Sequence, residues 1–128
     1  MKLGGDVVRA QAGVVAVALA GGSVRIYAGL RPEWPEQPPA QATLIAEVRL
    51  PDPAFEAMDG SLSARPIEAG KAVAKGRPTF FRCVSREGVV ILDGSIGPGK
   101  EMVLTASAVE VGAIVRIKGL TYGVSRGE

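Results

Sequence analysis

The stretch TFFRCVSREGVVILD, residues 79–93, is the part of the sequence that most directly decides the fold class. It contains two strand-like segments, Thr79–Ser85 and Val89–Asp93, and the short sequence Arg86-Glu87-Gly88 separates them. A short turn that contains Gly between two such segments is typical of a β-hairpin. The stretch therefore predicts two adjacent antiparallel strands.

Apolar and polar residues alternate with a period of two through much of the rest of the chain. Ser23–Ala28 and Thr43–Leu50 each place apolar residues on one face and polar residues mostly on the other. The other predicted strands are Ser61–Ile67, Met102–Thr105, Ala113–Lys118 and Leu120–Val124. Short strands joined by turns predict a mainly β protein, either a sandwich or a small barrel. We favour an antiparallel β-sandwich with jelly-roll or Greek-key connections.

An apolar segment precedes these strands, over about residues 6–20. Asp6 can cap a helix at its start, and Gly21-Gly22 can end one. We therefore expect a short N-terminal helix, with a strand over Gly13–Leu19 as the alternative because this part is rich in β-branched residues. The segment ends in a small-x-small pattern like that of a secretion signal. Polar residues interrupt it, and it is far shorter than the roughly 20 residues of a membrane span, so we interpret it as a buried element.

The composition describes one folded domain and argues against an enzyme. The chain has 128 residues, of which 47% are hydrophobic, so we expect a single domain over residues 1–128. It has no His and a single Cys, Cys83, which excludes catalytic triads, Cys-His dyads and His- or Cys-clustered metal sites within the chain. We expect no catalytic residue, no cofactor and no metal. The formal net charge of +2 is too small to predict nucleic acid as a partner, and we expect no membrane partner.

Two motifs resemble ligand sites, and we interpret both as turns or loops. Gly94–Lys100 has the Gly and Lys spacing of a phosphate-binding loop. However, Glu101 stands where Ser or Thr would hold magnesium, and a strand-like segment follows in place of a helix. The second motif is an acidic segment that matches no calcium-loop spacing and that we expect in a solvated loop; its members are Asp52, Glu56 and Asp59.

A Pro-rich loop over residues 31–39 contains four of the nine prolines and the single Trp, Trp34. Prolines cannot supply the hydrogen bonds of a central strand, so the segment must be an exposed or edge-covering loop. Pro32 and Pro35 also meet the minimal pattern of a polyproline ligand. We favour a loop that folds back so that Trp34 covers an apolar patch of its own domain. The alternative is a contact arm for a neighbouring subunit, with Trp34 as its anchor.

Four arginines occupy the polar face of predicted strands: Arg25, Arg49, Arg82 and Arg116. If their strands are neighbours, they form a basic stripe that could meet an acidic surface of another protein. The simpler interpretation, which we favour, is a solvated sheet face on which charges discourage aggregation. Cys83 alternates with Phe81 on the expected core side, which predicts a buried, unreactive thiol.

The segment GGSVRIYAGLRP, residues 21–32, carries a resemblance that continues along most of the chain. The further similar segments are residues 44–50, 53–55, 80–82, 88–97 and 115–117. Together they resemble a family of small proteins that are encoded in bacteriophage and prophage structural gene clusters and share a GG-(T/S)-(L/V)-R-I-Y-(S/A)-G-x-x-P segment. The chain departs from this family mainly in the Pro-rich loop, where the family is richer in Ala and Asn.

The resemblance implies a virion structural protein without an active site, made in the cytoplasm of the host bacterium and located in the virion. The expected partners are other virion proteins, such as the major capsid protein, and further copies of the chain. We favour a capsid decoration or cement protein over a neck or tail component. The competing class is a carbohydrate-binding module for host attachment, for which Trp34, Tyr27 and Tyr122 are the candidate aromatic platforms.

Overall fold

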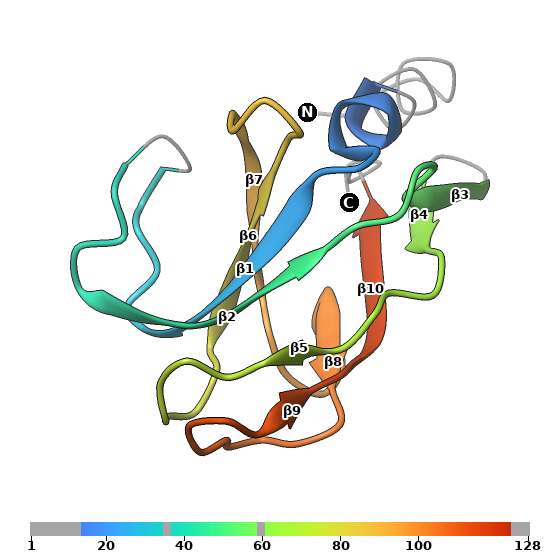
Figure 1. The fold of residues 1–128 in the computed structure, drawn as a ribbon. Coiled ribbons are helices and arrows are strands. Elements are labelled where there is room, and N and C mark those ends of the chain that lie inside the picture. Colours follow the sequence, from blue (N-terminus) through green and yellow to red (C-terminus); the bar gives the residue numbers. More distant parts are fainter. Residues whose placement is uncertain (1–13, 35–36, 59–60, 124–128) are drawn as a thin grey trace.

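The computed structural model describes residues 14–34, 37–58 and 61–123, and Figure 1 shows their arrangement. Strands make up 46% of the structure and helix 6%, which confirms a mainly β fold with one short N-terminal helix. The strands are antiparallel, as the alternating pattern predicted.

Two four-stranded sheets form the two layers of the sandwich. The first sheet has the order β2-β1-β6-β7. The second sheet has the order β3-β4-β10-β8, and a small sheet pairs β5 with β9. The bounds are β1 Ser23–Gly29, β2 Ala42–Arg49, β3 Phe55–Met58, β4 Ser61–Ala64, β5 Gly70–Lys71, β6 Phe80–Val84, β7 Val90–Ser95, β8 Met102–Leu104, β9 Ile114–Val115 and β10 Ile117–Gly123.

The hydrophobic core lies between the sheets and contains the residues that the alternation places on the inner faces. Ile26 and Phe81 are fully buried in the first sheet, and Leu62 and Met102 are fully buried in the second. Burying a side chain of this size stabilises the fold by roughly 1.5–3 kcal/mol. The ring of Phe81 fills the space above Gly94, where a Cβ atom would lie 2.3 Å from the ring. Gly94 is therefore required by packing.

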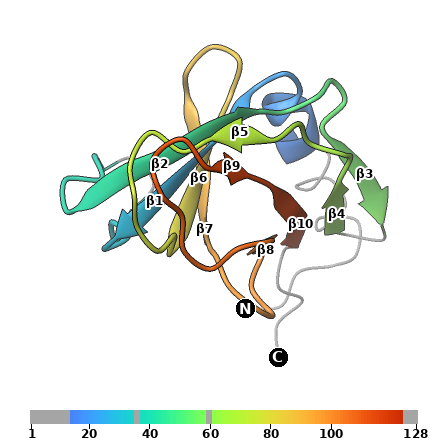
Figure 2. The same ribbon diagram turned by 60° about the horizontal axis from the view of Figure 1, so that its bottom comes forward.

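Several contacts join the layers at their edges. Ile96, just after β7, forms a parallel bridge with Met102 of β8, and the Gly97 N–H donates to the Met102 carbonyl at 3.0 Å. On the other side, Ile45 is a bulge residue of β2, and its carbonyl accepts a hydrogen bond from the Val73 N–H at 2.7 Å, which joins the first sheet to the segment after β5 of the small sheet. Figure 2 shows the resulting ring of strands around the core.

The N-terminal segment is helical over 14–19, which confirms that part of the predicted helix; residues 6–13 lie outside the described residues. Leu19 is fully buried in the core, whereas Val14 and Val17 are largely exposed. The Gly22 N–H donates to the Leu19 carbonyl at 2.9 Å, and Gly21 has φ +71°. The two glycines therefore end the helix, as expected.

The predicted hairpin is confirmed, and several other strands differ from the prediction. The β6–β7 turn contains Gly88 with φ +87°. In the Gly94–Lys100 region, Gly94 and Ser95 still belong to β7, and residues 97–100 form the predicted turn, which leads into β8. The C-terminal strands are β9 and β10, with bounds that differ from those predicted. The expectation of a solvated loop around Glu56 was wrong, because β3 forms there and pairs with β4. The two-residue strand β5 was not predicted either.

Candidate functional site

The connection between β1 and β2 projects from the described part of the molecule (Figure 1), and we call its described residues, 30–34 and 37–41, the arm. Its base is closed by a hydrogen bond from the Leu30 N–H to the Gln41 carbonyl, at 3.1 Å. Gly29 precedes the arm with φ +117°, and a Cβ atom there would lie 2.6 Å from the Gln41 carbonyl oxygen. Only glycine allows the two sides of the arm to approach so closely.

Trp34 is held in an exposed position by two hydrogen bonds with Gln37 across the arm. The Trp34 N–H donates to the Gln37 side-chain oxygen at 2.9 Å, and the Gln37 N–H donates back to the Trp34 carbonyl at 3.0 Å. The Trp34 residue is 59% exposed. The favoured expectation that Trp34 covers an apolar patch of its own domain was therefore wrong. Pro32 lies in the arm before Trp34, and Pro35 lies outside the described residues.

A long-range contact fixes the arm to the far side of the first sheet. The Arg31 guanidinium donates to Ser95 Oγ at 3.2 Å and to the Asp93 carbonyl at 3.5 Å. Both acceptors belong to β7, which lies two strands away from β1 in the sheet. A second contact comes from Thr79 Oγ1, which donates to the Gly29 carbonyl at 2.8 Å. The arm is therefore held in one orientation by side chains that no local sequence pattern predicts.

A row of four charged residues crosses the outer face of the first sheet, in the register Glu47, Arg25, Arg82, Asp93. Arg25 Nε lies 2.9 Å from Glu47 Oε2, and both side chains are about two-fifths exposed or more. Arg82 makes a two-pronged contact, with Nε 2.8 Å from Asp93 Oδ1 and an Nη nitrogen 3.1 Å from Oδ2. These carboxylates raise the pKa of Arg25 and Arg82, chiefly through the side-chain hydrogen bonds. The row thus contains as many negative as positive charges.

The four arginines do not form a basic stripe. Arg82 is 4% exposed and neutralised by Asp93. Arg116 is exposed but lies between β9 and β10, outside the first sheet. Arg49 is exposed at the end of β2, next to the Arg25–Glu47 pair. The expectation of a solvated sheet face was also wrong at Arg82, because this part of the face is buried.

Arg86 is a charged residue that the sequence reasoning did not single out as part of this face. It lines a shallow depression of about 390 Å³ together with Arg25, Glu47 and Arg49. One of its Nη nitrogens lies 2.8 Å from Asp52 Oδ2 and also donates to the Ala20 carbonyl at 3.2 Å. The position of Arg86 in a predicted turn does not indicate which residues its side chain contacts. The depression therefore contains three arginines, of which two are paired with carboxylates in the described structure.

Tyr27 and Phe80 form a buried aromatic stack on the same outer face. Their ring centroids lie 5.0 Å apart, with an angle of 9° between the rings. Tyr27 is 6% exposed and Phe80 is 1% exposed. Tyr27 therefore offers no open platform for a sugar ring. The side chain of Tyr122 is outside the described residues.

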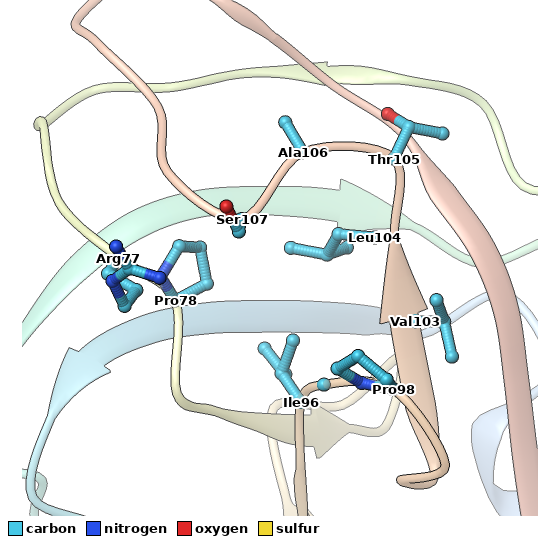
Figure 3. A pocket seen from close by; sticks show the side chains of 10 residues that line it. Arg77, Pro78, Ile96, Pro98, Val103, Leu104, Thr105, Ala106 and Ser107 are labelled. Atoms are coloured by element: carbon cyan, nitrogen blue, oxygen red, sulfur yellow. The ribbon is translucent and has the colours of Figure 1, made fainter.

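An apolar groove lies beside the turn between β7 and β8, and Figure 3 shows its lining. It has a volume of about 460 Å³. Pro78, Ile96 and Leu104 point toward a common space, and the exposed Arg77 lies beside Pro78 (Figure 3). The other apolar lining residues with side chains are Pro98, Val103 and Ala106. No local sequence pattern predicts this groove, because its lining comes from three separate segments.

The described residues contain no group of three or more potential metal-ligating side chains of the His, Cys, Asp and Glu types. Within the same ranges, no helix is both long and apolar enough to cross a membrane. Cys83 is 1% exposed, and burial raises the pKa of its thiol far above the ordinary value. The prediction of a buried Cys83 is therefore confirmed.

The chain matches no protein-family model, and searches of curated proteins and of solved structures find no similar protein.

Proposed function

We propose that this protein is a structural subunit of a bacteriophage virion and that it binds other virion proteins through its arm. Two observations support the proposal. Residues 21–32 and the later segments resemble phage structural proteins, and Trp34 is exposed. The exposed position of Trp34 is the single observation that carries the binding role. A large aromatic side chain, 59% exposed on a hydrogen-bonded turn, can be buried against a partner with little loss of conformational entropy.

Among virion positions, a capsid decoration or cement protein is our first choice, with the major capsid protein as the partner. Decoration proteins bind in many copies, so that weak individual contacts add up through multivalency. A neck or tail component is the second choice and would use the same arm. A carbohydrate-binding module has less support, because Tyr27 is buried in its stack with Phe80 and leaves Trp34 as the exposed aromatic of the described candidates.

The test is a binding assay with particles of the phage or prophage that encodes the protein, prepared without this subunit. We expect saturable binding to capsids, and substitution Trp34→Ala should weaken it by at least about 30-fold, as for a central interface anchor. Val89→Ala is the matched control, because Val89 is also an exposed apolar residue (57%) but lies in the β6–β7 turn.

Binding to isolated tails or necks in place of capsids would select the second position. If the protein binds neither particle and instead gives specific hits on a glycan array, the virion proposal is wrong.

A further inference from the structure

We propose that Trp34 of one copy of this protein inserts into the apolar groove of a second copy, so that copies associate head to tail. This inference rests on the proposed function and identifies one partner of the arm. The arm and the groove are two unlike surfaces of the same chain. One presents an exposed indole, and the other is an apolar hollow of about 460 Å³.

The groove has room for an indole and a partly apolar lining. Its volume falls within the range of about 300–1,000 Å³ that is typical of ligand pockets. The rings of Pro78 and Pro98 and the side chain of Leu104 offer flat and branched apolar contacts for an aromatic ring (Figure 3). Arg77 is in position at the same groove to contact the face of an inserted indole, a favourable cation–π arrangement.

Charge complementarity favours a second copy as the occupant. Glu33 is exposed immediately before Trp34 in the arm, and Arg77 is exposed in the groove lining. Insertion of Trp34 therefore brings a carboxylate toward a guanidinium. Because both groups belong to every copy, each copy carries both halves of the contact.

The arm's own contacts oppose insertion into the groove of the same chain. Arg31 fixes the arm to β7, and the Trp34–Gln37 hydrogen bonds fix its tip. In this orientation Trp34 is exposed and is not part of the groove lining. A contact between two unlike surfaces is heterologous, so it generates closed rings or open chains of copies. Both are arrangements that a virion component can use.

Trp34 is the only Trp of the chain, so its fluorescence reports directly on the proposed contact. With rising protein concentration, we expect the Trp emission to shift to shorter wavelength, in parallel with a rise in mass measured by light scattering. Ala106→Glu places a negative charge at the edge of the groove, where it repels Glu33 of the entering arm, and should abolish both changes. Val111→Glu is the control, because Val111 is 68% exposed and lies outside the groove.

A mixture of two deficient variants tests the head-to-tail geometry. Trp34→Ala keeps the groove but has no Trp, and Ala106→Glu keeps the arm but has an altered groove. Each alone should be a monomer, with self-association at least about 30-fold weaker than that of the unchanged protein. Mixed together they should form a dimer that grows no further. All Trp fluorescence in this mixture comes from the Ala106→Glu variant, so a shift to shorter wavelength shows its Trp34 entering the other copy.

The charge contact has its own test. Glu33→Arg and Arg77→Glu should each weaken self-association by about two- to fivefold, in the range of exposed ion pairs. Their combination in one chain restores the opposite charges and should self-associate more tightly than Arg77→Glu alone, although the cation–π contact of Arg77 with the indole stays lost. Circular dichroism on each variant confirms that it is folded.

Three results would overturn the head-to-tail contact: a chain that stays monomeric, variants that show no fluorescence shift when mixed, or an Ala106→Glu variant that still self-associates. A blue-shifted emission that is independent of concentration and is lost in Ala106→Glu would also overturn it, because Trp34 would then occupy its own groove. The particle-binding assay separates this failure from failure of the proposed function. If the protein is monomeric and still binds virion particles through Trp34, the proposed function stands and only the contact with a second copy is wrong.

Discussion

We predict that removal of the negative charge from the Arg82–Asp93 ion pair strongly lowers the unfolding free energy. Asp93→Asn removes the negative charge with almost no change in side-chain shape. The Arg82 guanidinium then remains buried, with a side chain 4% exposed, and has the positive Arg25 as its cross-strand neighbour. Leaving one charge of a buried pair without its partner costs about 3–5 kcal/mol. Since domains of this size have an unfolding free energy of about 5–15 kcal/mol, the loss is a large part of the total.

The Arg25–Glu47 pair in the same row provides the matched control. Its side chains are 39% and 47% exposed, so water and salt screen the charges. We expect Glu47→Gln to lower the unfolding free energy by about 0.2–1 kcal/mol. Added salt should reduce the effect of Glu47→Gln much more than that of Asp93→Asn.

Urea unfolding followed by far-UV circular dichroism measures both effects, with linear extrapolation to water. Circular dichroism is preferable to Trp fluorescence here because Trp34 is already exposed in the folded state. The double change of Arg82→Met with Asp93→Leu should be close to neutral, because it removes both charges and retains the volume. An Asp93→Asn loss no larger than that of Glu47→Gln would refute the reasoning, since it would mean that water compensates the Arg82 charge in the folded protein.

Further predictions concern the core, the arm and the buried thiol. The Cys83 thiol should not react with a thiol reagent in the folded protein and should react fully in denaturant, because it is 1% exposed and burial raises its pKa; rapid native labelling would contradict this. Gly94→Ala should lower stability by about 1–3 kcal/mol because its Cβ atom would meet the Phe81 ring at 2.3 Å, and Phe81→Leu in the same chain should recover part of the loss. Trp34→Ala should change the unfolding free energy by no more than about 0.5 kcal/mol, since exposed side chains contribute little to folding; a larger loss in urea titration would assign Trp34 a structural role.

In the β6–β7 hairpin, the sequence predicts the two strands but not how their residues pair. The turn at Gly88 and the apolar segments around it correctly predict two antiparallel strands. A simple continuation of that turn would place Arg82 opposite Leu92. The structure has an irregularity between Cys83 and Val84, where Ile91 is an extra residue, and it shifts the register so that Arg82 faces Asp93. The ion pair therefore depends on a bulge, and local alternation carries no signal for a bulge.

Strand β5, which was not predicted, is set by its partner strand more than by its own residues. β5 consists of Gly70 and Lys71, which have low intrinsic strand preference, and β9 pairs with it.

The burial of a side chain is also hard to predict from the sequence. Alternation shows which face of a strand carries a side chain, as it did for Arg82, but it does not show whether another part of the molecule covers that face.

The exposure of Trp34 was mispredicted for a related reason. A lone Trp in a Pro-rich segment fits both a loop folded over its own domain and a projecting arm. The contacts that decide between them link Arg31 to residues 93 and 95, more than sixty positions along the chain. Such distant polar contacts follow from the tertiary fold and have no local pattern.

The hydrogen bonds of Arg31 also determine how the molecule carries a mechanical load. Force applied to the end of an isolated two-stranded hairpin opens its hydrogen bonds one after another, like a zipper. In this protein, a pull on the arm acts on β1 through the chain and on β7 through Arg31. Simultaneous loading of several strands resists rupture better than sequential opening. If the arm binds a partner as proposed, its resistance to a pull therefore depends in part on the Arg31 guanidinium.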